Sequence, residues 1–183
     1  METKEKEGMQ GIVRIQLKDK RGNRKPLFQG NRLWDIIHGL VGIDLKVPYI
    51  TGKWTLEMVS GNAIKDAGLA VAAKRLGGIT ANPISHIAIG IGTGGTTALN
   101  SEITTGGGAR ASATISSQTK NVSGDTVRCT HTFAFTASFS VTEEGLFNAS
   151  SEGDLIAYKE FSSIGVADGD SLEITHDVTM SAS

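Results

Sequence analysis

Three glycines in a short apolar stretch have the spacing of a dinucleotide-binding site. Residues 86–95 read HIAIGIGTGG, and Gly90, Gly92 and Gly95 fit the pattern G-x-G-x-x-G. A dinucleotide site also needs a helix that begins at the last glycine and a later strand that ends in an acid. Three consecutive glycines at 106–108 interrupt such a helix, and the next strand-like segment ends without an acid. We therefore expect no cofactor, and we assign the glycines to a tight turn or a close backbone approach at a sheet edge.

One cysteine and four scattered histidines are the residues that best suit a transition metal. Cys129 is the only cysteine, which excludes a disulfide within the chain and a four-thiolate metal site. Cys129, His131 and His176 share the inward phase of their predicted strands, so together they could hold a metal. A histidine with a hydrogen-bonded role in the core is the commoner outcome. We predict no metal site.

Paired acids and reactive serines are the remaining candidates for catalysis. Glu143 and Glu144 stand next to each other before Gly145 at a predicted strand end. Adjacent strand residues point to opposite faces, so the two carboxyl groups are not placed for joint acid/base work. We interpret them as solvated charges at a turn. The sequence contains no G-x-S-x-G motif, and we expect no catalytic residue and no enzyme.

Charge is distributed unevenly along the 183 residues, although the net charge is only −1. Nine of the 18 Lys and Arg residues lie in the first 32 positions, whereas nine acids against Lys159 alone follow from Thr136 onward. A basic arm that docks on the acidic face of a neighbouring copy would suit this distribution. The loop KDKRGNRK at 18–25 could instead contact nucleic acid, but short basic clusters are usually solvated turns. We expect no nucleic-acid partner.

Membrane and secretion signals are missing from the sequence. No apolar run approaches the roughly 18 residues that a membrane span needs. The N-terminal METKEKEGMQ is charged and lacks the apolar core of a signal peptide. We expect neither a membrane partner nor secretion.

The first half of the chain predicts a partly helical, extended basic arm. Residues 11–17 favour a short strand that ends at a turn. Residues 32–42 have apolar positions at helical spacing, with Asn31 as the cap and Gly42 as the stop. The segment that follows, with Pro48, is expected to be an extended connection. Residues 62–78 predict a second helix, capped by Asn62 and weakened by a glycine in its interior.

The second half alternates between apolar and polar residues with period two, most clearly over 125–141 and 172–180. A single strand over 125–141 would exceed about 50 Å, so we expect a break near 136–138. Successive strands that each have one solvent-exposed polar face and one buried apolar face predict an antiparallel β-sandwich or flattened barrel. We place this domain at 82–183, after an N-terminal strand, helix and docking arm at 1–81. The predicted core is Val127, Phe133, Phe135, Phe139, Leu172, Ile174 and Val178.

Several segments resemble, in order, a group of small structural proteins of tailed bacteriophages. They are IAIGIGTGGTTALNSEI, GGARASATI, DTVRCTHTFAFTASFSVTEEGLFNAS and DLIAYKEFSSIGVADGDSLEITHDVTM. They are similar to the family's "AIGTGT-TA-T-L-E", "TEEGLFNA" and "GDSLEIT-V" segments, and NAIKDAGLAVAAKRLGG matches a helix-like stretch before the first strand. The resemblance covers residues 62–180 and implies a tail, collar, neck or head-associated virion protein. It brings no catalytic residues.

We therefore expect a non-enzymatic virion protein, assembled in the cytoplasm of a bacterial host, that forms homo-oligomers and binds other virion proteins through its N-terminal arm. Deleting residues 1–50 should then leave a folded monomer that does not assemble. The alternative is a receptor- or glycan-binding module of a phage appendage, for which Phe147 and Tyr158 are the candidate stacking residues in the second half. The predicted assembly contacts are Arg21, Arg24, Lys25, Leu33, Trp34, Ile37, Leu40, Tyr49 and Trp54.

Overall fold

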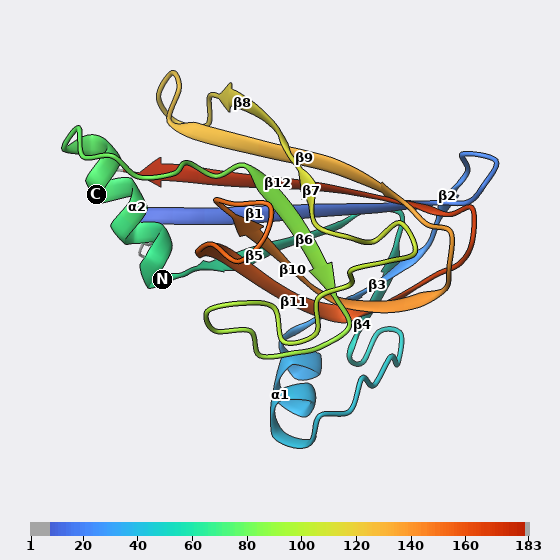
Figure 1. Cartoon of the computed structure of the whole chain (residues 1–183). Helices are drawn as coiled ribbons and strands as arrows, with labels where there is room; N and C mark the ends of the chain where they lie inside the picture. The colour runs from blue at the N-terminus through green and yellow to red at the C-terminus, as the bar shows by residue number, and fades with distance from the viewer. Residues whose placement is uncertain (1–7, 182–183) are drawn as a thin grey trace.

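The computed structural model describes residues 8–181, which form mainly antiparallel strands (Figure 1). Strands make up 48% of the structure and helices 12%, so the predicted fold class is confirmed. The two helices are α1 (Arg32–Val41) and α2 (Asp66–Leu76). The strands are β1 (Gly8–Lys18), β2 (Arg24–Lys25), β3 (Leu27–Gly30), β4 (Gly52–Thr55), β5 (Met58–Ile64), β6 (His86–Gly90), β7 (Ala111–Ser112), β8 (Thr114–Gln118), β9 (Thr126–Ala134), β10 (Phe139–Phe147), β11 (Leu155–Val166) and β12 (Ser171–Ser181).

Nine strands form one nearly closed sheet in the order β7-β6-β10-β11-β5-β1-β12-β9-β8, with β2 attached to β1. Figure 1 shows β9, β12 and β1 side by side in one layer, with β10 and β11 below them. β5 joins the layers, because Met58–Asn62 pair with β1 and Ala63–Ile64 pair with β11. The sheet ends, β7 and β8, are separated only by Ala113. The molecule is therefore a flattened barrel.

β1 lies at the centre of this sheet and not in an arm. All eleven of its residues pair with β12, from Gly8 opposite Ser181 to Lys18 opposite Ser171, and its other edge pairs with β5. The sheet thus contains strands from both sides of the boundary that we placed between residues 81 and 82. Removal of residues 1–50 would take out a central strand, so the structure changes our expectation: this truncation should not leave a folded monomer.

The structure places the first helix where the sequence predicted it. α1 is capped by Asn31, whose side chain accepts hydrogen bonds from the backbone N–H groups of Leu33 (2.9 Å) and Trp34 (3.2 Å). It ends at Gly42, which has a left-handed backbone (φ 68°). The second helix begins four residues later than predicted, because Asn62 belongs to β5.

The long alternating segment breaks near the expected place, since β9 ends at Ala134 and β10 begins at Phe139. The break carries the chain from one layer to the other, because β9 pairs with β12 and β8 whereas β10 pairs with β11 and β6. Two predicted core residues differ: Val127 is 40% exposed, one residue from the start of β9, and Phe139 is half-buried. The core prediction is confirmed for Phe133, Phe135, Leu172, Ile174 and Val178.

Neither helix within residues 8–181 has the length and hydropathy to cross a bilayer. Residues 1–7, which hold most of the charged N-terminus from which we expected no signal peptide, lie outside the described residues.

Candidate functional site

Helix α1 shows most of its apolar side chains to solvent but buries the ring of Trp34. Trp34 is 5% exposed and its indole N–H donates to Asp44 Oδ1 at 2.8 Å. The Trp34 ring stacks on His38, with ring centroids 4.7 Å apart and planes 8° apart. Gly30 makes room for this ring, because a Cβ there would lie 2.7 Å from it. Trp34 therefore fixes the helix to its own chain.

The connection from α1 to β4 is also held against β11. Asp44 Oδ2 accepts a hydrogen bond from the Ser163 N–H at 3.0 Å, and the Lys46 ammonium donates to the Ser163 carbonyl and hydroxyl oxygens. Thr51 is fully buried, and its hydroxyl accepts from the Val47 N–H at 2.8 Å. The connection thus has a defined position although no regular element runs through it.

This attachment leaves a large set of apolar side chains exposed between positions 33 and 56. We call them the exposed apolar segment. Leu40 is 79% exposed and Tyr49 is 99% exposed. Soluble monomers rarely leave many large apolar side chains uncovered in one region, and such regions mark interaction sites. The segment comprises Leu33, Ile36, Leu40, Val41, Ile43, Leu45, Tyr49, Ile50, Trp54 and Leu56.

The predicted assembly contacts fall into groups with different surroundings. Those that lie in the exposed apolar segment are Leu33, Leu40, Tyr49 and Trp54. The Trp34 ring is buried within its own chain and so offers little surface to another copy, and Ile37 is half-buried.

The three basic residues lie elsewhere, around the turn between β1 and β2. Arg21 and Arg24 are exposed, whereas the Lys25 ammonium forms an ion pair with Asp170 at 2.7 Å. Figure 1 places this turn at the right-hand end of the sheet and α1 on its lower side. The basic and apolar contacts therefore do not form one surface.

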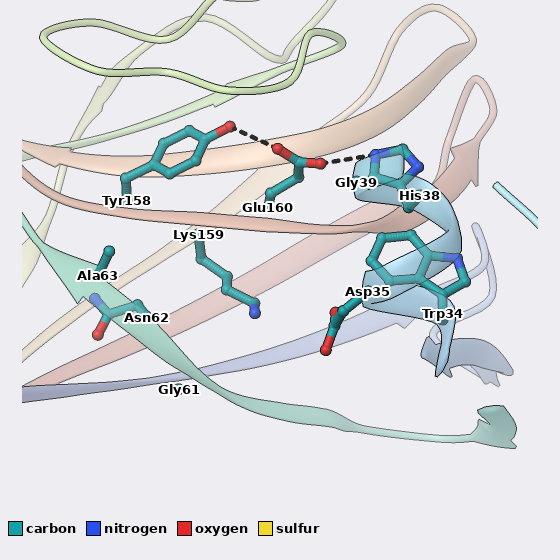
Figure 2. A pocket seen from close by; sticks show the side chains of 10 residues that line it. All are labelled: Trp34, Asp35, His38, Gly39, Gly61, Asn62, Ala63, Tyr158, Lys159 and Glu160. Atoms are coloured by element: carbon teal, nitrogen blue, oxygen red, sulfur yellow. Dashed lines mark hydrogen bonds and ion pairs between the residues drawn. The ribbon is translucent and has the colours of Figure 1, made fainter. Parts of the chain in front are cut away.

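A pocket of about 360 Å³ opens between α1 and the barrel (Figure 2). α1, β5 and β11 each line part of it. Glu160 is bound from two sides, by His38 Nε2 at 2.7 Å and by the Tyr158 hydroxyl at 3.3 Å. Figure 2 shows Lys159 directed into the space between Asn62 and Asp35. The pocket therefore combines two carboxylates, a histidine and an ammonium group beside the exposed apolar segment.

Within residues 8–181, the Lys159 ammonium group is one of two charged groups of this pocket without a bonded partner, and the other is the Asp35 carboxylate. The ammonium group has no hydrogen bond or ion pair to any residue of 8–181. Burial lowers the pKa of Lys159 below its ordinary value, although Asp35 and two glutamates act in the opposite direction. An unpaired, partly desolvated cation in a pocket is suited to receive an acidic group from outside.

A second polar cluster is enclosed in the barrel behind this pocket. Asn62, which lines the pocket, bonds through Nδ2 to Nε2 of the fully buried His176. Nδ1 of His176 lies 3.2 Å from Glu144 Oε2, and Glu144 is also fully buried. Burial raises the pKa of the Cys129 thiol to about 12, and the charge of Glu144 acts in the same direction. Cys129 is therefore a neutral core thiol and not a nucleophile.

The structure brings only two of the three proposed metal ligands together. Cys129 is directly opposite His176 in the pairing of β9 with β12. His131 is opposite Ile174, and its Nδ1 lies 3.1 Å from the Ser112 carbonyl oxygen. Within residues 8–181, no three His, Cys, Asp or Glu side chains form a group that could hold a metal ion.

Two of the three glycines of the G-x-G-x-x-G pattern, Gly90 and Gly92, pack around a buried carboxylate. Glu143 is fully buried and accepts hydrogen bonds from the Ser101 N–H (3.0 Å) and the Tyr158 hydroxyl (3.1 Å). A Cβ at Gly90 would lie 2.5 Å from Glu143 Oε1, and one at Gly92 would lie 2.9 Å from it. The glycines thus permit the close backbone approach that we expected. No helix follows them before β7.

Both glutamates of the pair at 143–144 are buried, so their interpretation as solvated charges is wrong. They do point to opposite faces: Glu143 bonds to the loop at 100–101, and Glu144 faces His176. A register irregularity between Val141 and Glu143 precedes them on β10. Sequence patterns also missed the pocket residues Asn62, Lys159 and Glu160, because the pocket exists only where α1, β5 and β11 meet.

Comparison with known proteins gives no identification: no family model, no curated protein and no solved structure matches this chain.

Proposed function

We propose that this protein is a non-enzymatic structural component of a bacteriophage particle, located in the tail, the collar or neck, or on the head. The proposal places it in the virion after assembly in the cytoplasm of a bacterial host. Its partners are further copies of itself and other virion structural proteins. The ordered sequence segments that resemble small phage structural proteins support the virion assignment, and the exposed apolar segment supports assembly.

The exposed apolar segment is the observation that carries this proposal. Its side chains stand on α1, on the connection to β4, on β4 itself and just after β4. Trp34 and Asp44 hold α1 and the connection against the barrel. Because the segment already has a fixed position, less conformational entropy is lost when a partner binds. At about 25 cal/mol per Å², burial of several hundred Å² of apolar surface stabilises a contact by several kcal/mol before the association entropy is subtracted. Many copies on one particle would convert such contacts into a persistent assembly.

The pocket beside α1 places charged side chains next to the exposed apolar segment. Its Lys159 ammonium group, unpaired within residues 8–181, offers an ion-pair partner to an acidic side chain of a docking protein. The C-terminal half of the chain is rich in acids, so another copy could supply one.

Charge substitutions in the exposed apolar segment test the assembly proposal. Leu33→Glu and Leu40→Glu place carboxylates on side chains that are 42% and 79% exposed, so the monomer should still fold. We expect the wild-type chain to self-associate in analytical ultracentrifugation, and each variant to weaken self-association at least about tenfold. Leu76→Glu is the matched control, because Leu76 is an 80% exposed leucine on the other helix.

Two outcomes would contradict the proposal. One is a wild-type protein that stays monomeric at about 100 µM, a concentration at which even weak specific contacts are populated. The other is self-association of Leu40→Glu that equals that of the wild type.

The exposed aromatic residues favour a second candidate, a receptor- or glycan-binding module. Phe147 and Tyr158, the candidates from the sequence, are 1% and 7% exposed and cannot stack on a sugar. Tyr49 and Trp54 are exposed and could do so. A glycan array in which Tyr49→Ala and the wild type both give background signal would remove this candidate.

A further inference from the structure

A small hollow on the outer face of the barrel gathers basic side chains. The strands that line it are not those that line the pocket beside α1. The hollow has a volume of about 160 Å³ and lies over β1, β12 and β9, next to the loop between β8 and β9. Its charged lining residues are Arg14 on β1, Arg128 on β9, Asp177 on β12 and Lys120 on the loop. Three cations and one anion give these lining residues a net charge of +2.

The two guanidinium groups are held side by side by one carboxylate. Arg14 Nη1 donates to Asp177 Oδ2 at 2.6 Å, and Arg128 donates through Nε and Nη2 to the two oxygens of Asp177 at 2.7 and 2.8 Å. Each arginine has further N–H groups, because a guanidinium carries five donors. Asp177 thus positions the pair and neutralises only one of the two charges.

The loop that carries Lys120 is also fixed. The Asp125 carboxylate accepts hydrogen bonds from the backbone N–H groups of Lys120 (2.9 Å), Asn121 (2.7 Å) and Val122 (2.9 Å). These bonds hold the pKa of Asp125 well below its usual range, and the bond from the Val122 N–H contributes most. The Asp125 carbonyl oxygen also accepts from the Met180 N–H at 2.9 Å, which ties the loop to β12. The backbone of Lys120 therefore has a set position relative to the two arginines.

We propose that this hollow binds a phosphate-type oxyanion. The N–H groups of two neighbouring guanidinium groups match the tetrahedral oxygens of phosphate. Because these groups are already fixed, the entropy cost of binding is reduced. Thr126 and Thr179 belong to the support of the site, because the Thr126 hydroxyl donates to Asp125 Oδ1 at 2.9 Å and lies 2.9 Å from the Thr179 hydroxyl. The lining contains no aromatic side chain on which a base could stack. The ligand group is therefore the phosphate itself. This inference does not depend on the assembly proposal.

Titration with inorganic phosphate at constant ionic strength, followed by ³¹P NMR and calorimetry, tests the site. We expect saturable binding with one phosphate per chain. Lys120→Gln should weaken binding about fivefold, because Lys120 is exposed and its side chain makes no contact that the fold needs. Arg128→Gln should weaken it more than about tenfold. Lys53→Gln on β4, an exposed lysine outside the hollow, should bind phosphate like the wild type.

Two sources of the phosphate group are distinguished with a short DNA duplex in a fluorescence anisotropy assay. If phosphate competes with the duplex and Lys120→Gln weakens both ligands, the group is supplied by a nucleic-acid backbone. If phosphate binds and the duplex binding is not changed by Lys120→Gln, the group is a free anion or a small phosphate ester. The proposal is overturned if phosphate shows no saturable binding up to about 20 mM. It is also overturned if Lys120→Gln, with a wild-type circular-dichroism spectrum, binds phosphate as tightly as the wild type.

Discussion

A fully buried carboxylate, Glu143, anchors the glycine-rich loop that follows β6. It accepts hydrogen bonds from two backbone N–H groups of the loop, those of Asn100 (3.3 Å) and Ser101 (3.0 Å), and from the Tyr158 hydroxyl. Gly90 and Gly92 leave the space that the carboxylate fills. The first two glycines of the spacing that looked like a nucleotide motif are thus explained by one side chain on the neighbouring strand, and the third, Gly95, packs against the Tyr158 ring.

Replacement of Glu143 by leucine should destabilise the protein by about 2–4 kcal/mol, because the buried Tyr158 hydroxyl and two partly buried backbone N–H groups lose this acceptor. Glu143→Gln, which keeps one acceptor oxygen, should have a smaller effect. Glu173→Gln is the control, because the side chain of Glu173 is 34% exposed and its ion pair with Lys18 is long, at 3.5 Å; we expect a change below about 0.5 kcal/mol. The measurement is urea-induced unfolding at pH 7. Equal midpoints for Glu143→Leu and wild type would show that the anchor is dispensable.

At the scale of elements, the two helices depend on glycine in opposite ways. Gly68 in α2 is buried, and a Cβ there would lie 2.4 Å from the Ile156 carbonyl oxygen of β11. Gly39 in α1 is exposed, and a Cβ there would meet no atom within 4 Å. The first glycine therefore permits helix–sheet packing, whereas the second only weakens its helix.

Alanine at these two positions should change stability with opposite signs. Gly68→Ala should destabilise the protein by about 1–3 kcal/mol, because α2 must move away from β11. Gly39→Ala should stabilise it by up to about 1 kcal/mol, because alanine restricts the unfolded chain and favours the helix. Thermal unfolding followed by circular dichroism measures both. A rise in Tm for Gly68→Ala would mean that the helix does not need this close approach.

The elements that sequence predicted best are those with local causes. Asn31 and Gly42 stand at the ends of α1 and act through their own neighbours, so both ends of this helix were predictable. Asn62 was read as a cap, but pairing with Gly11 on β1 and the bond to His176 draw it into a strand. These partners are 51 and 114 residues away, and no local pattern contains them.

The same reason explains what sequence showed of the candidate site. The sequence predicted Leu40 and Tyr49 as contacts with another chain and not as core residues, and the structure leaves both side chains exposed. The burial of Glu144 and the position of Lys159 were not predicted, because charged residues are usually exposed to solvent. Both depend on β10 and β11 pairing with each other, where Glu144 and Lys159 are direct neighbours.

At the scale of the whole molecule, the sheet depends on β1, which is hydrogen-bonded along both edges. Its residues Val13, Ile15 and Leu17 are at most 2% exposed. A chain that begins at residue 19 should therefore lose cooperative unfolding and bind a hydrophobic dye such as ANS, because the edges of β5 and β12 become unpaired. Comparison of its thermal transition with that of the full-length chain is the measurement. A sharp transition at the wild-type temperature would show that the barrel closes without this strand.

The pairing of Gly8 with Ser181 also has a consequence for synthesis in the cell. While the ribosome is still translating, β1 can pair with β5, but its other edge has no partner until residues 171–181 emerge. Because this contact closes a loop of more than 150 residues, it forms late and slowly. A nascent chain therefore carries an open strand edge during almost all of its elongation, and translation that stops before β12 yields a product prone to aggregate.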